Sequence, residues 1–595
     1  MNSKLQTPNP TMHSNNNINN LSPAARSIVA DYAKRRGIAP PQLDDFLNPK
    51  LALDRCNLPD AEKVLARLNR AAANREKLLL FGDYDCDGIS STAILLRFLG
   101  QRTSLTPAFA FALPDRRFDH YGLDLEKAKS LFCKFRPSLL ICLDCGTNSA
   151  EAVTWLKAHG VDTIVVDHHP PSEEKSTDAV AMGNPKVHPA AQTSDLGDLC
   201  AAGLTLVLCN YLARAWQCAE KWDSAAATGL AGLGTLADAV PMSAINRSIA
   251  KSAITLINDR AVLNPITGLA ALVPANGRRI TQRQLQFEII PAINALGRLN
   301  SAEPGVNLLT TANRAEAAAI ATQCLELNAA RKVKQQEMTV QASALAREVL
   351  EHHPQATVLV LADRRWHHGV AGPTASQIAE SFGRSTILLA PNGTGWKGSG
   401  RSRNGDDLGQ WIRTMKALGL VERGGGHAAA VGLAATSAQI PALQSAGLAV
   451  PMPQVDNAEP DSEILGEIDR LSPEEWLDVI ELLEPFGRGN PYPIIAASNA
   501  LCRSKPATLT LRDSGKPWGA KAEFQTEAGQ VILPVWRDFE AALSSWSPGK
   551  RCHLELEVSK KAHNGRVYFN WAVSACRTSS TDGSGCDSFE EAELR

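Results

Sequence analysis

Short apolar runs alternate with longer helical segments from about residue 75 onward. The runs "KLLLF", "SLLICLD" and "DTIVVD" have the length of buried strands, and the segments "SSTAILLRFLG" and "NSAEAVTWLKAHG" after the first two have the length and spacing of helices. Short apolar strands that alternate with helices predict a doubly wound parallel sheet. In such sheets, sites lie beyond the carboxyl ends of the strands, so the ends of these runs are the expected place of a functional site.

A second α/β region follows a long helical stretch. Residues 312–353 contain neither proline nor glycine, which predicts a helix long enough to connect two domains. The runs "ATVLVLAD", "STILLAP" and "GTGWKGSGRS" then restart the strand pattern, in a domain that ends near residue 450. Between that domain and the C-terminal part, the stretch "AVPMPQVDNAEPDSE" is typical of a linker.

The C-terminal part begins helical and then alternates in short segments such as "RCHLELEVSKK" and "RVYFNWAV", which predicts a small β-barrel. Residues 1–22 and 578–595 are polar, with many asparagines in the first stretch, so both tails are expected to be disordered. The predicted fold class is therefore α/β: two α/β domains joined by a long helix, plus a C-terminal barrel.

Composition and charge narrow the possible functions. The 595 residues, 44% hydrophobic and 21% charged, are typical of several globular domains. The 61 basic and 62 acidic residues leave a net charge of -1, so a polyanion must meet a local basic patch. The 13 cysteines form no regular framework, which indicates reduced thiols in the cytoplasm. Since no apolar leader or membrane-length run is present, we expect a soluble protein without membrane contact.

Carboxylates crowd the end of the first predicted strand. Asp83, Asp85 and Asp87 alternate there, directly before Gly88. Residues two apart in an extended segment face the same way, so these side chains can approach one point. Three adjacent carboxylates could not all stay ionised unaided, because like charges raise one another's pKa. A cation site is therefore expected, and a helix N-cap is the alternative for one or two of the aspartates.

Later segments supply similar groups. Asp144 ends the second strand. The third strand ends in Asp167, His168 and His169, where imidazoles beside a carboxylate suit a metal or a phosphate. Asp238 interrupts the apolar stretch "TGLAGLGTLADAVPM", and a buried carboxylate needs a partner, which could be a metal, an arginine or backbone amides. Each residue alone is compatible with helix capping, but their placement at successive strand ends favours one common site.

The motifs "DYDCDG", "LDCGTNS", "VVDHHP" and "GTLADAVPM", in this order, resemble the DHH phosphoesterases. Further matches, from "INALGRLNSAEPGVNLL" through "WHHGVAGPTASQIAE", "KGSGRS" and "GGGHAAAVGL" to "LLEPFGRGNPYP", resemble the RecJ single-strand DNA exonucleases within that superfamily. The resemblance covers roughly residues 75–575. It implies a tail at 1–22, a DHH catalytic domain at 23–310, a connecting helix at 311–353, a DHH-associated substrate-binding domain at 354–450, an OB-fold nucleic-acid-binding domain at 455–577, and a tail at 578–595.

By likeness to the family, the acidic set binds two metal ions. The first ion would be held by Asp85 and Asp144. The second would be held by Asp87, Asp144, His168 and Asp238, so that Asp144 bridges the two. Oxygen-rich ligands with one imidazole suit Mn²⁺ or Mg²⁺ better than zinc, and Mn²⁺ is the first choice. Two such ions activate a bridging water for hydrolysis of a phosphodiester.

Three neighbouring positions complete this expectation. By likeness, Asp83 lies close to the first ion and His169 faces the scissile phosphate. Some relatives have a histidine where this chain has Phe81, so the first ion is expected to be weakly held or hydrated. The C-x-x-C of Cys142 and Cys145 is an alternative zinc or redox feature, but no second cysteine pair accompanies it.

Glycine-rich turns in the second α/β domain suit a phosphate, because backbone amides and hydroxyl or basic side chains can close around it. The turns in "WKGSGRSRNG" and "RGGGHAAAVG" carry Lys397 and Ser399 beside the residues below. The alternative is that they are ordinary turns. With the resemblance, the expected substrate contacts are Ser376, Arg401, Ser402, Gly425, Gly426 and His427, and Arg298, Arg331 and Lys332 are expected to face the same cleft.

The C-terminal domain supplies aromatic and basic residues. Its aromatic side chains could stack bases, although aromatic residues in barrels are more often part of the core; they are Trp518, Trp536, Trp546, Tyr568, Phe569 and Trp571. Its basic residues would track a nucleic-acid backbone; they are Arg512, Lys516, Lys521, Lys550, Arg551, Lys560, Lys561 and Arg566.

The resemblance implies a metal-dependent exonuclease that degrades single-stranded DNA from 5′ to 3′ in repair and recombination. It implies single-stranded DNA as the substrate, a single-strand-binding protein and a helicase as partners, and a monomeric state. A phosphodiesterase for short RNA or cyclic dinucleotides is one alternative, but such enzymes need no barrel domain. A non-catalytic replication scaffold is another, and it predicts gaps in the acidic set that this chain does not have.

Overall fold

The protein divides into two compact units, each discontinuous in sequence. The structure is a computed structural model that describes residues 18–101, 109–117, 122–172, 175–188, 195–274, 279–403, 405–455, 462–510, 517–537, 539–563, 566–579 and 589–590. The terminal unit comprises the described parts of Met1–Pro49, Pro460–Phe486 and Pro491–Glu593. The central unit comprises the described parts of Lys50–Glu459 together with Gly487–Asn490.

The central unit contains a five-stranded parallel sheet in the order β2-β1-β3-β4-β5. Its strands are β1 (Leu78–Phe81), β2 (Phe109–Ala112), β3 (Leu139–Leu143), β4 (Asp162–Val166) and β5 (Ala181–Met182). The register pairs Phe81 with Cys142 and Leu143 with Val166, so β1, β3 and β4 end at the same edge. The parallel sheet predicted from the sequence is confirmed.

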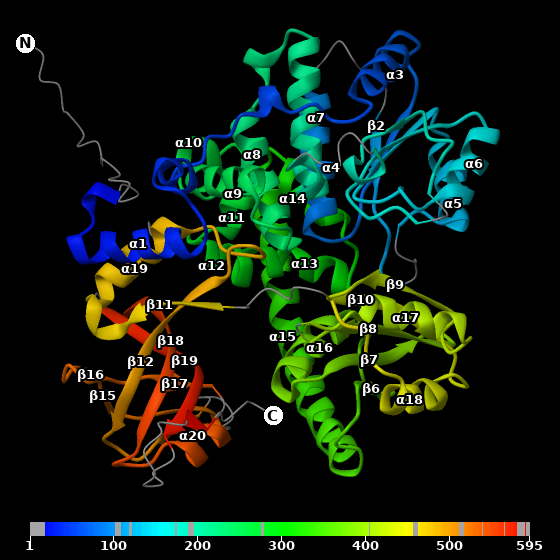
Figure 1. Ribbon diagram of the computed structural model, residues 1–595. Helices are drawn as coiled ribbons and strands as arrows, with labels where there is room; N and C mark the ends of the chain where they lie inside the picture. Colours follow the sequence, from blue (N-terminus) through cyan, green and yellow to red (C-terminus); the bar gives the residue numbers. More distant parts are fainter. Residues whose placement is uncertain are drawn as a thin grey trace, which may run out of the picture. The chain divides into compact units, whose positions relative to one another are not determined.

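Helices cover both faces of this sheet (Figure 1). Leu80 and Ile141 belong to a core shared with α3 (Ala61–Ala73) and α4 (Cys86–Gly100). Leu79, Leu140 and Val165 belong to a second core with α5 (Leu125–Phe135) and α6 (Ala150–Ala158). Successive side chains of a strand point to opposite faces, so a sheet covered on both faces needs strands that are apolar throughout.

A mostly helical region follows the sheet. Its helices are α7 (Ala201–Ala215), α8 (Ser224–Ala237), α9 (Ala244–Ile257), α10 (Arg260–Leu263), α11 (Thr267–Leu272), α12 (Gln282–Gln284), α13 (Ile290–Leu299) and α14 (Glu303–Thr310). A π-helical turn, η8 (Leu285–Ile289), joins α12 to α13, and short 3-10 turns are η3 (Leu53–Arg55), η5 (Pro185–Val187), η6 (Asp195–Asp198) and η7 (Ala219–Lys221). Helix α8 is apolar around its circumference because it packs against α4, α7 and α9.

One long helix leads to a second sheet. Helix α15 (Arg314–His352) has 39 residues and lies within the predicted connecting segment. The sheet has the order β6-β7-β8-β10-β9 and is mixed, since only β6 and β7 pair in parallel. Its elements are β6 (Val358–Ala362), α16 (His368–Phe382), β7 (Ser385–Asn392), β8 (Gly395–Arg401), α17 (Leu408–Ala417), β9 (Arg423–His427), β10 (Ala430–Ala435) and α18 (Ile440–Ala449).

The terminal unit contains a third, larger sheet. Its strands are β11 (Ser462–Glu467), β12 (Tyr492–Cys502), β13 (Ala507–Thr510), β14 (Pro517–Lys521), β15 (Phe524–Gln525), β16 (Val531–Ile532), β17 (Val535–Trp536), β18 (Arg551–His563), β19 (Arg566–Ser579) and β20 (Phe589–Glu590). Its helices are α1 (Pro23–Arg35), α2 (Leu43–Leu47), α19 (Pro473–Leu483) and α20 (Phe539–Ser545), with the 3-10 turns η1 (Ile18–Asn20), η2 (Pro40–Gln42) and η9 (Ile468–Arg470). The strand path runs from β13 to β16, and among the described residues no pairing closes it. The predicted OB-type barrel is therefore not confirmed.

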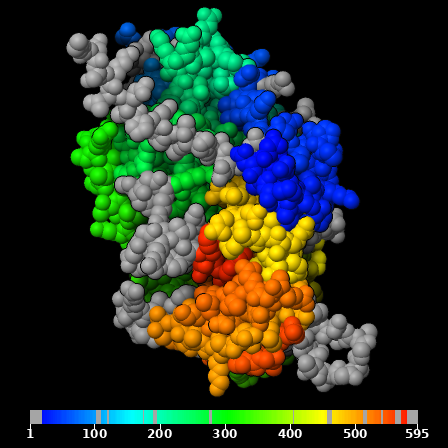
Figure 2. Space-filling model, turned by 90° about the vertical axis from the view of Figure 1, so that its left-hand side faces the viewer, coloured from blue at the N-terminus to red at the C-terminus, as the bar shows by residue number. Residues whose placement is uncertain are grey.

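Helix α1 belongs to the terminal unit. Ile28, Val29 and Tyr32 of α1 lie in one core with Trp476 of α19, and Figure 2 shows the dark-blue N-terminal residues beside the yellow segment around α19. The division thus differs from the sequence-based boundaries, which grouped residues 23–49 with the DHH catalytic domain. The physical reason is that the apolar face of α1 is buried against the C-terminal segment.

The tryptophans of the terminal unit are core residues where they are described. Trp536, Trp546 and Trp571 are buried, and Phe569 packs against the same core, so the core alternative holds for these side chains. Several predicted contacts lie outside the described side chains: Arg512, Lys516, Trp518, Lys560, Lys561, Arg566 and Tyr568. Lys521, Lys550 and Arg551 are exposed. No helix of the described residues is long and apolar enough to cross a membrane.

Candidate metal centre

The turn after β1 separates its three aspartates. Asp85 is the N-cap of α4, and its Oδ1 accepts hydrogen bonds from the backbone N–H groups of Asp87 at 3.0 Å and Gly88 at 3.1 Å. Asp83 is only 1% exposed. Gly88 allows this turn, because a Cβ there would lie 2.5 Å from the backbone nitrogen of Asp83. The capping alternative therefore applies to Asp85, whose cap leaves the other carboxylate oxygen to the site.

Asp87 is fixed by the N-terminus of α7. Its Oδ2 accepts from Ala201 N–H at 2.8 Å and its Oδ1 from Ala202 N–H at 2.9 Å. Burial and the charge of Asp85 raise the pKa of Asp87 to about 6, against the opposing effect of the hydrogen bonds. The backbone of another helix thus holds a buried carboxylate whose remaining lone pairs can bind a cation.

Asp144 follows β3 in a left-handed conformation, with φ of 63°. Its N–H donates to Val166 O at 3.0 Å, which extends the sheet pairing by one residue. Burial, followed by the charges of Asp87 and Asp85, holds the pKa of Asp144 well above its usual range. Asp144 is therefore a buried carboxylate in the repulsive field of the other acids, a condition that a divalent cation relieves.

The turn after β4 holds two histidines in different states. Asp167 Oδ1 accepts from His168 N–H at 2.7 Å and lies 2.7 Å from His169 Nδ1, while its Oδ2 accepts from Thr147 N–H at 3.0 Å. Although burial acts to lower the pKa of His169, the charge and hydrogen bond of Asp167 raise it to about 9. His169 is therefore a cation at neutral pH and suits a phosphate oxygen.

His168 is neutral and surrounded by carboxylates. Burial and the charge on His169 lower the pKa of His168 to about 3. Its Nε2 lies 3.3 Å from Asp144 Oδ1, 3.4 Å from Asp238 Oδ2 and 3.9 Å from Asp87 Oδ2. Among the described residues neither ring nitrogen makes a hydrogen bond, and neither does Asp83 Oδ1, although these atoms are buried. These buried nitrogen and oxygen atoms belong to a set of carboxylates and one neutral imidazole. Such a set suits Mn²⁺ or Mg²⁺ as its metal ion.

The predicted ligands come together at the edge where β1, β3 and β4 end. Potential ligand atoms lie within 4.8 Å of one another in three groups: Asp83 with Asp85 and Asp144; Asp87 with His168 and Asp238; and Asp144 with His168 and His169. Asp144 belongs to two of these groups, and its bridging role stays a prediction. Phe81 is fully buried in the apolar core and Asp83 takes a place in the first group.

Four guanidinium groups influence one another near this centre. Burial and the charges of Arg116, Arg401 and Arg331 lower the pKa of Arg298 to about 9. Burial and the charge of Arg116 lower the pKa of Arg401 to about 10. Arg298 donates to Gly369 O at 3.1 Å, and the Cζ of Arg116 lies 5.0 Å from the centre of the Tyr84 ring. A concentration of positive charge on half-buried side chains is suited to an oligoanion such as a nucleic-acid backbone.

The other predicted substrate residues are placed less uniformly. His427, at the end of β9, has its pKa lowered by partial burial and by the charges of Arg401 and His169, so it lies near both. Ser376 is exposed on α16 and donates to Gly372 O at 3.4 Å, and no described contact links it to the arginines. Gly425 and Gly426 belong to β9, and Ser402 N–H donates to Ala429 O at 3.0 Å. Lys332 is exposed on α15.

Three residues near the centre were not predicted from the sequence: Arg116, Asn184 and Lys186. Arg116 follows β2, whose carboxyl end lies at the same edge of the sheet, and the strand-end rule would have found it. Asn184 follows β5 and is fully buried; its Nδ2 donates to Thr147 Oγ1 at 2.8 Å and to His169 O at 2.9 Å. Lys186 Nζ donates to His168 O at 2.6 Å. Asn184 and Lys186 thus fix the turn that carries the two histidines.

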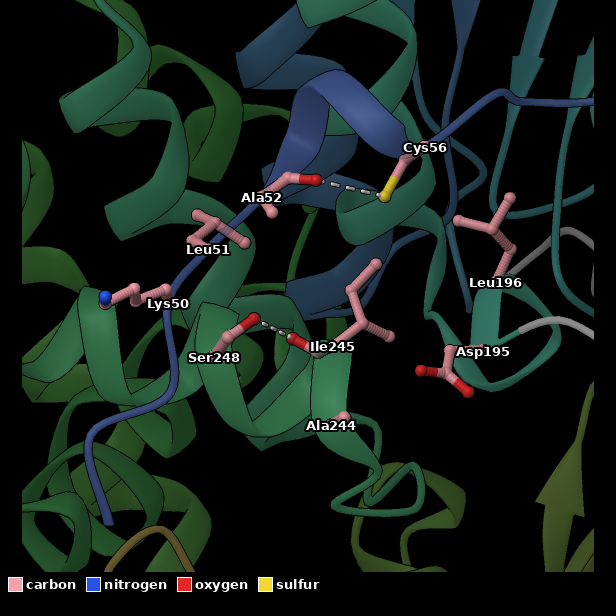
Figure 3. Close-up of a pocket in the computed structure, with 9 residues that line it drawn as sticks. All are labelled: Lys50, Leu51, Ala52, Cys56, Asp195, Leu196, Ala244, Ile245 and Ser248. Atoms are coloured by element: carbon pink, nitrogen blue, oxygen red, sulfur yellow. Dashed lines mark hydrogen bonds between the residues drawn. The ribbon is translucent and has the colours of Figure 1, made fainter. Parts of the chain in front are cut away.

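A separate hollow contains none of these residues. Figure 3 shows a pocket of about 330 Å³ between the segment from Lys50 to Cys56, η6 and the start of α9. Its side chains are mostly apolar, with Lys50 and Asp195 as the charged groups. Cys56 Sγ donates to Ala52 O and Ser248 Oγ to Ile245 O, so both groups are engaged locally.

Comparison with known proteins agrees with this architecture. The profile of the DHH family, N-terminal domain, matches residues 77–234, and that of the DHHA1 domain matches residues 355–447. These ranges contain the first sheet with its acidic edge and the second sheet, in which the glycine-rich segments expected to be turns form mainly the strands β8 and β9. The fold and the site together place the chain in the DHH class, with one range that matches each of the two family domains.

Full-length relatives give a narrower assignment. The chain is 30% identical over 459 residues to the single-stranded-DNA-specific exonuclease RecJ of Escherichia coli, covering 73% of this chain and 77% of that protein. The RecJ of Bacillus subtilis is 30% identical over 539 residues, which are 86% of this chain. This chain belongs to the RecJ family. It spans 65% of the length of the Bacillus relative and 62% of that of the Thermus thermophilus relative.

A solved structure extends the likeness. The crystal structure of RecJ from Thermus thermophilus in complex with Mn²⁺ is similar to this structure with a TM-score of 0.72, at 25% sequence identity. The match covers 95% of this chain and 77% of the other. The likeness thus includes the described parts of both units.

Proposed function

We propose that this protein is a metal-dependent exonuclease that hydrolyses single-stranded DNA from the 5′ end. One observation carries the proposal: potential metal ligands from four separate segments, around Asp85, Asp144, His168 and Asp238, lie together at one edge of the first sheet. The names of the RecJ relatives, each a single-stranded-DNA-specific exonuclease, support the substrate. The 5′ to 3′ direction and the role in repair and recombination rest on resemblance to this family.

We assign the ions to two sets of residues. Asp83, Asp85 and Asp144 would hold one, and Asp87, His168 and Asp238, with Asp144 as the bridge, would hold the other. The ions, Mn²⁺ or Mg²⁺ as in the RecJ structures from Thermus thermophilus, would supply an activated water and neutralise charge that develops on the phosphate. Neutral His168 is already in its ligating state, and the amides of α7 keep Asp87 in place.

His169 has a different task in this scheme. Asp167 engages its Nδ1 and keeps the ring protonated, so we assign its Nε2–H to a non-bridging oxygen of the scissile phosphate. A hydrogen bond from a cation to this oxygen strengthens as negative charge grows in the transition state. Asn184 holds the backbone carbonyl of His169 and so maintains this orientation.

The guanidinium cluster would bind the phosphate of the terminal nucleotide. We assign Arg298 and Arg401 to this phosphate, with Arg116 beside them and Ser402, His427 and the backbone amides of Gly425 and Gly426 in β9 on the second sheet. Burial and neighbouring guanidinium charges lower the pKa values of Arg298 and Arg401, and a bound phosphate would remove the repulsive part of this effect. Because such a site lies at a fixed distance from the metal centre, it would bind the terminal phosphate of a strand and so select strand ends over strand interiors.

The terminal unit is proposed to bind the rest of the strand. Its exposed Lys521, Lys550 and Arg551 support an OB-type nucleic-acid-binding role. The further elements of the proposal are a monomer, a cytoplasmic place of action, and a single-strand-binding protein and a helicase as partners. Each of these follows from resemblance to the family.

The test is digestion of single-stranded DNA labelled separately at each end. With Mn²⁺ we expect short labelled products to appear first from the 5′-labelled strand, and no products with chelator or with Asp144→Asn. Products released from the 3′ end, or activity that survives chelation, contradict the proposal. Preference for a short ribonucleotide or a cyclic dinucleotide over a long DNA strand would favour the alternative phosphodiesterase function.

A further inference from the structure

An exposed aromatic side chain lies on the π-helical turn that precedes α13. Phe287 is 64% exposed and is the only aromatic residue among the strongly exposed large hydrophobic residues of the described chain. Its neighbours Leu285 and Ile289 are buried in the core, so the turn is anchored on one side and presents Phe287 on the other. π-helical turns are rare and occur frequently at functional sites.

Polar contacts tie this turn to the metal centre. Buried Gln282 donates from Nε2 to Gln286 Oε1 at 3.1 Å, and Gln286 donates from Nε2 to Leu236 O at 3.4 Å. Leu236 lies near the end of α8, two residues before Asp238. The hydrogen bonds therefore fix Phe287 to the same helix end that presents a predicted metal ligand.

The surroundings of Phe287 favour a nucleotide over an apolar partner. The Cζ of Arg283 lies 5.4 Å from the centre of the Phe287 ring. An isolated ring beside a guanidinium offers a π face for a base and positive charge for its phosphate, whereas a protein interface needs a wider apolar patch. An unpaired base has two exposed π faces, while a base inside a duplex has both covered.

We propose that Phe287 stacks against an unpaired base of the strand whose phosphodiester lies at the metal centre, with Arg283 contributing positive charge beside it. This inference rests on the proposed function and names one of its contacts with the substrate. Because every base has a π face, the contact would be tolerant of sequence and selective for single strands.

An abasic scan locates such a contact. In the Asp144→Asn background, which prevents turnover, fluorescence anisotropy would measure binding of oligodeoxynucleotides that each carry one abasic site at a successive position from the 5′ end. One position should weaken binding by about 5–100-fold. In the Phe287→Ala protein the intact strand should bind more weakly by a similar factor, and the abasic site at that position should have no further effect.

Matched variants separate stacking from other causes. Phe287→Trp should restore both the affinity and the abasic profile, whereas Phe287→Leu, which keeps apolar area without a π face, should resemble Phe287→Ala. Leu418→Ala is the control, because Leu418 is 61% exposed on the second α/β part. It should bind like the parent protein. A Mn²⁺-induced rise of Tm in Phe287→Ala, with Asp144 retained, confirms an intact metal centre.

Three results would overturn the inference. The first is an abasic profile in Phe287→Ala that matches the parent at every position. The second is wild-type affinity in Phe287→Ala, and the third is full rescue by Phe287→Leu. These results leave the proposed function intact as long as the parent protein still degrades the strand from its 5′ end. Failure of the wild-type chain to bind or degrade single-stranded DNA would instead refute the proposed function itself.

Discussion

At the scale of single residues, Asp144 combines a proposed role as a metal ligand with a cost in stability. Its pKa is held above the usual range by burial and by neighbouring carboxylates. A carboxyl group with a raised folded-state pKa disfavours folding at pH values above that pKa, and the penalty disappears below the ordinary carboxyl pKa. In the metal-free protein near pH 8 this penalty is therefore present, and a bound cation would reverse it.

The Asp144→Asn variant tests this balance. Asparagine tolerates the left-handed backbone at this position, so the change removes charge with little strain. In chelator at pH 8 we expect the Tm of Asp144→Asn to be about 1–4 °C above that of the wild-type protein. Adding Mn²⁺ should not raise the Tm of the variant further, and the activity of the variant should be at least about 10³-fold below that of the wild-type protein. Asp195→Asn, an exposed change, should behave like wild type. A lower Tm of Asp144→Asn in chelator would contradict the argument.

Asn184 gives a second prediction at this scale. Asn184→Ala removes the hydrogen bonds to the buried Thr147 hydroxyl and to the His169 carbonyl, so we expect a loss of about 1–3 kcal/mol in unfolding free energy and about 10–100-fold in activity. Denaturant unfolding and initial rates measure these effects. Asn148→Ala is the control: Asn148 also donates to the turn, at Pro170 O, but it is exposed. Equal effects of the two variants would mean that burial of Asn184 is unimportant.

Several potential metal ligands of the site could be predicted from the sequence, because parallel strands end at one edge of the sheet. Asp85, Asp144 and His168 followed from that rule, and the structure brings them together. Asn184 could not be predicted, because its role depends on contacts with Thr147 and His169, which are distant in sequence. The tasks assigned to individual ligands stay predictions.

At the scale of elements, the glycines of α8 distinguish tight from loose packing. A Cβ at Gly234 would lie 2.5 Å from Asp87 Oδ1 and 2.7 Å from Ala202 Cβ, whereas a Cβ at Gly229 would have Ile257 Cγ1 as its nearest neighbour, at 3.8 Å. Helix α8 thus approaches the acidic centre closely only near its C-terminal end. Glycine at position 234 keeps Asp87 seated on the amides of α7.

We therefore expect opposite effects of two alanine substitutions on one helix. Gly234→Ala should displace Asp87, lower the unfolding free energy by about 1–3 kcal/mol and weaken Mn²⁺ binding. Gly229→Ala should be neutral or should stabilise by about 0.5–1 kcal/mol, because alanine favours the helix. Denaturant unfolding and calorimetric Mn²⁺ titration measure both variants. The packing argument fails if Gly234→Ala binds Mn²⁺ as tightly as Gly229→Ala does.

Elements were predictable where periodicity is local. Strands β1, β3 and β4 of the first sheet and helix α15 have patterns that cover the whole element, and the structure confirms them, whereas β2 and β5 were not predicted. The C-terminal strands were recognisable as strands, but their order depends on long-range pairing, such as β12 with β18, that no local pattern specifies. For the same reason, the partner of α1 was not evident from its own sequence.

At the scale of the whole molecule, the terminal unit joins both ends of the chain. Ile28, Val29 and Tyr32 of α1 are fully buried with residues from the C-terminal segment. Each such side chain contributes roughly 1.5–3 kcal/mol when it leaves water. A deletion that removes only the C-terminal segment would therefore expose an apolar helix face, while a deletion that also removes residues 1–49 would not.

Two fragments test this division. We expect residues 50–459 to unfold cooperatively and to retain Mn²⁺-dependent hydrolysis of short strands, with weaker binding of long ones, because the terminal unit is absent. Residues 1–459 should bind a dye for exposed apolar surface and aggregate, since α1 lacks its partner. Thermal unfolding, dye fluorescence and light scattering of both fragments beside the full chain measure the difference. Equal solubility of the two fragments would show that α1 is stable without the C-terminal segment, and equal losses on short and long strands would assign the terminal unit a structural role only.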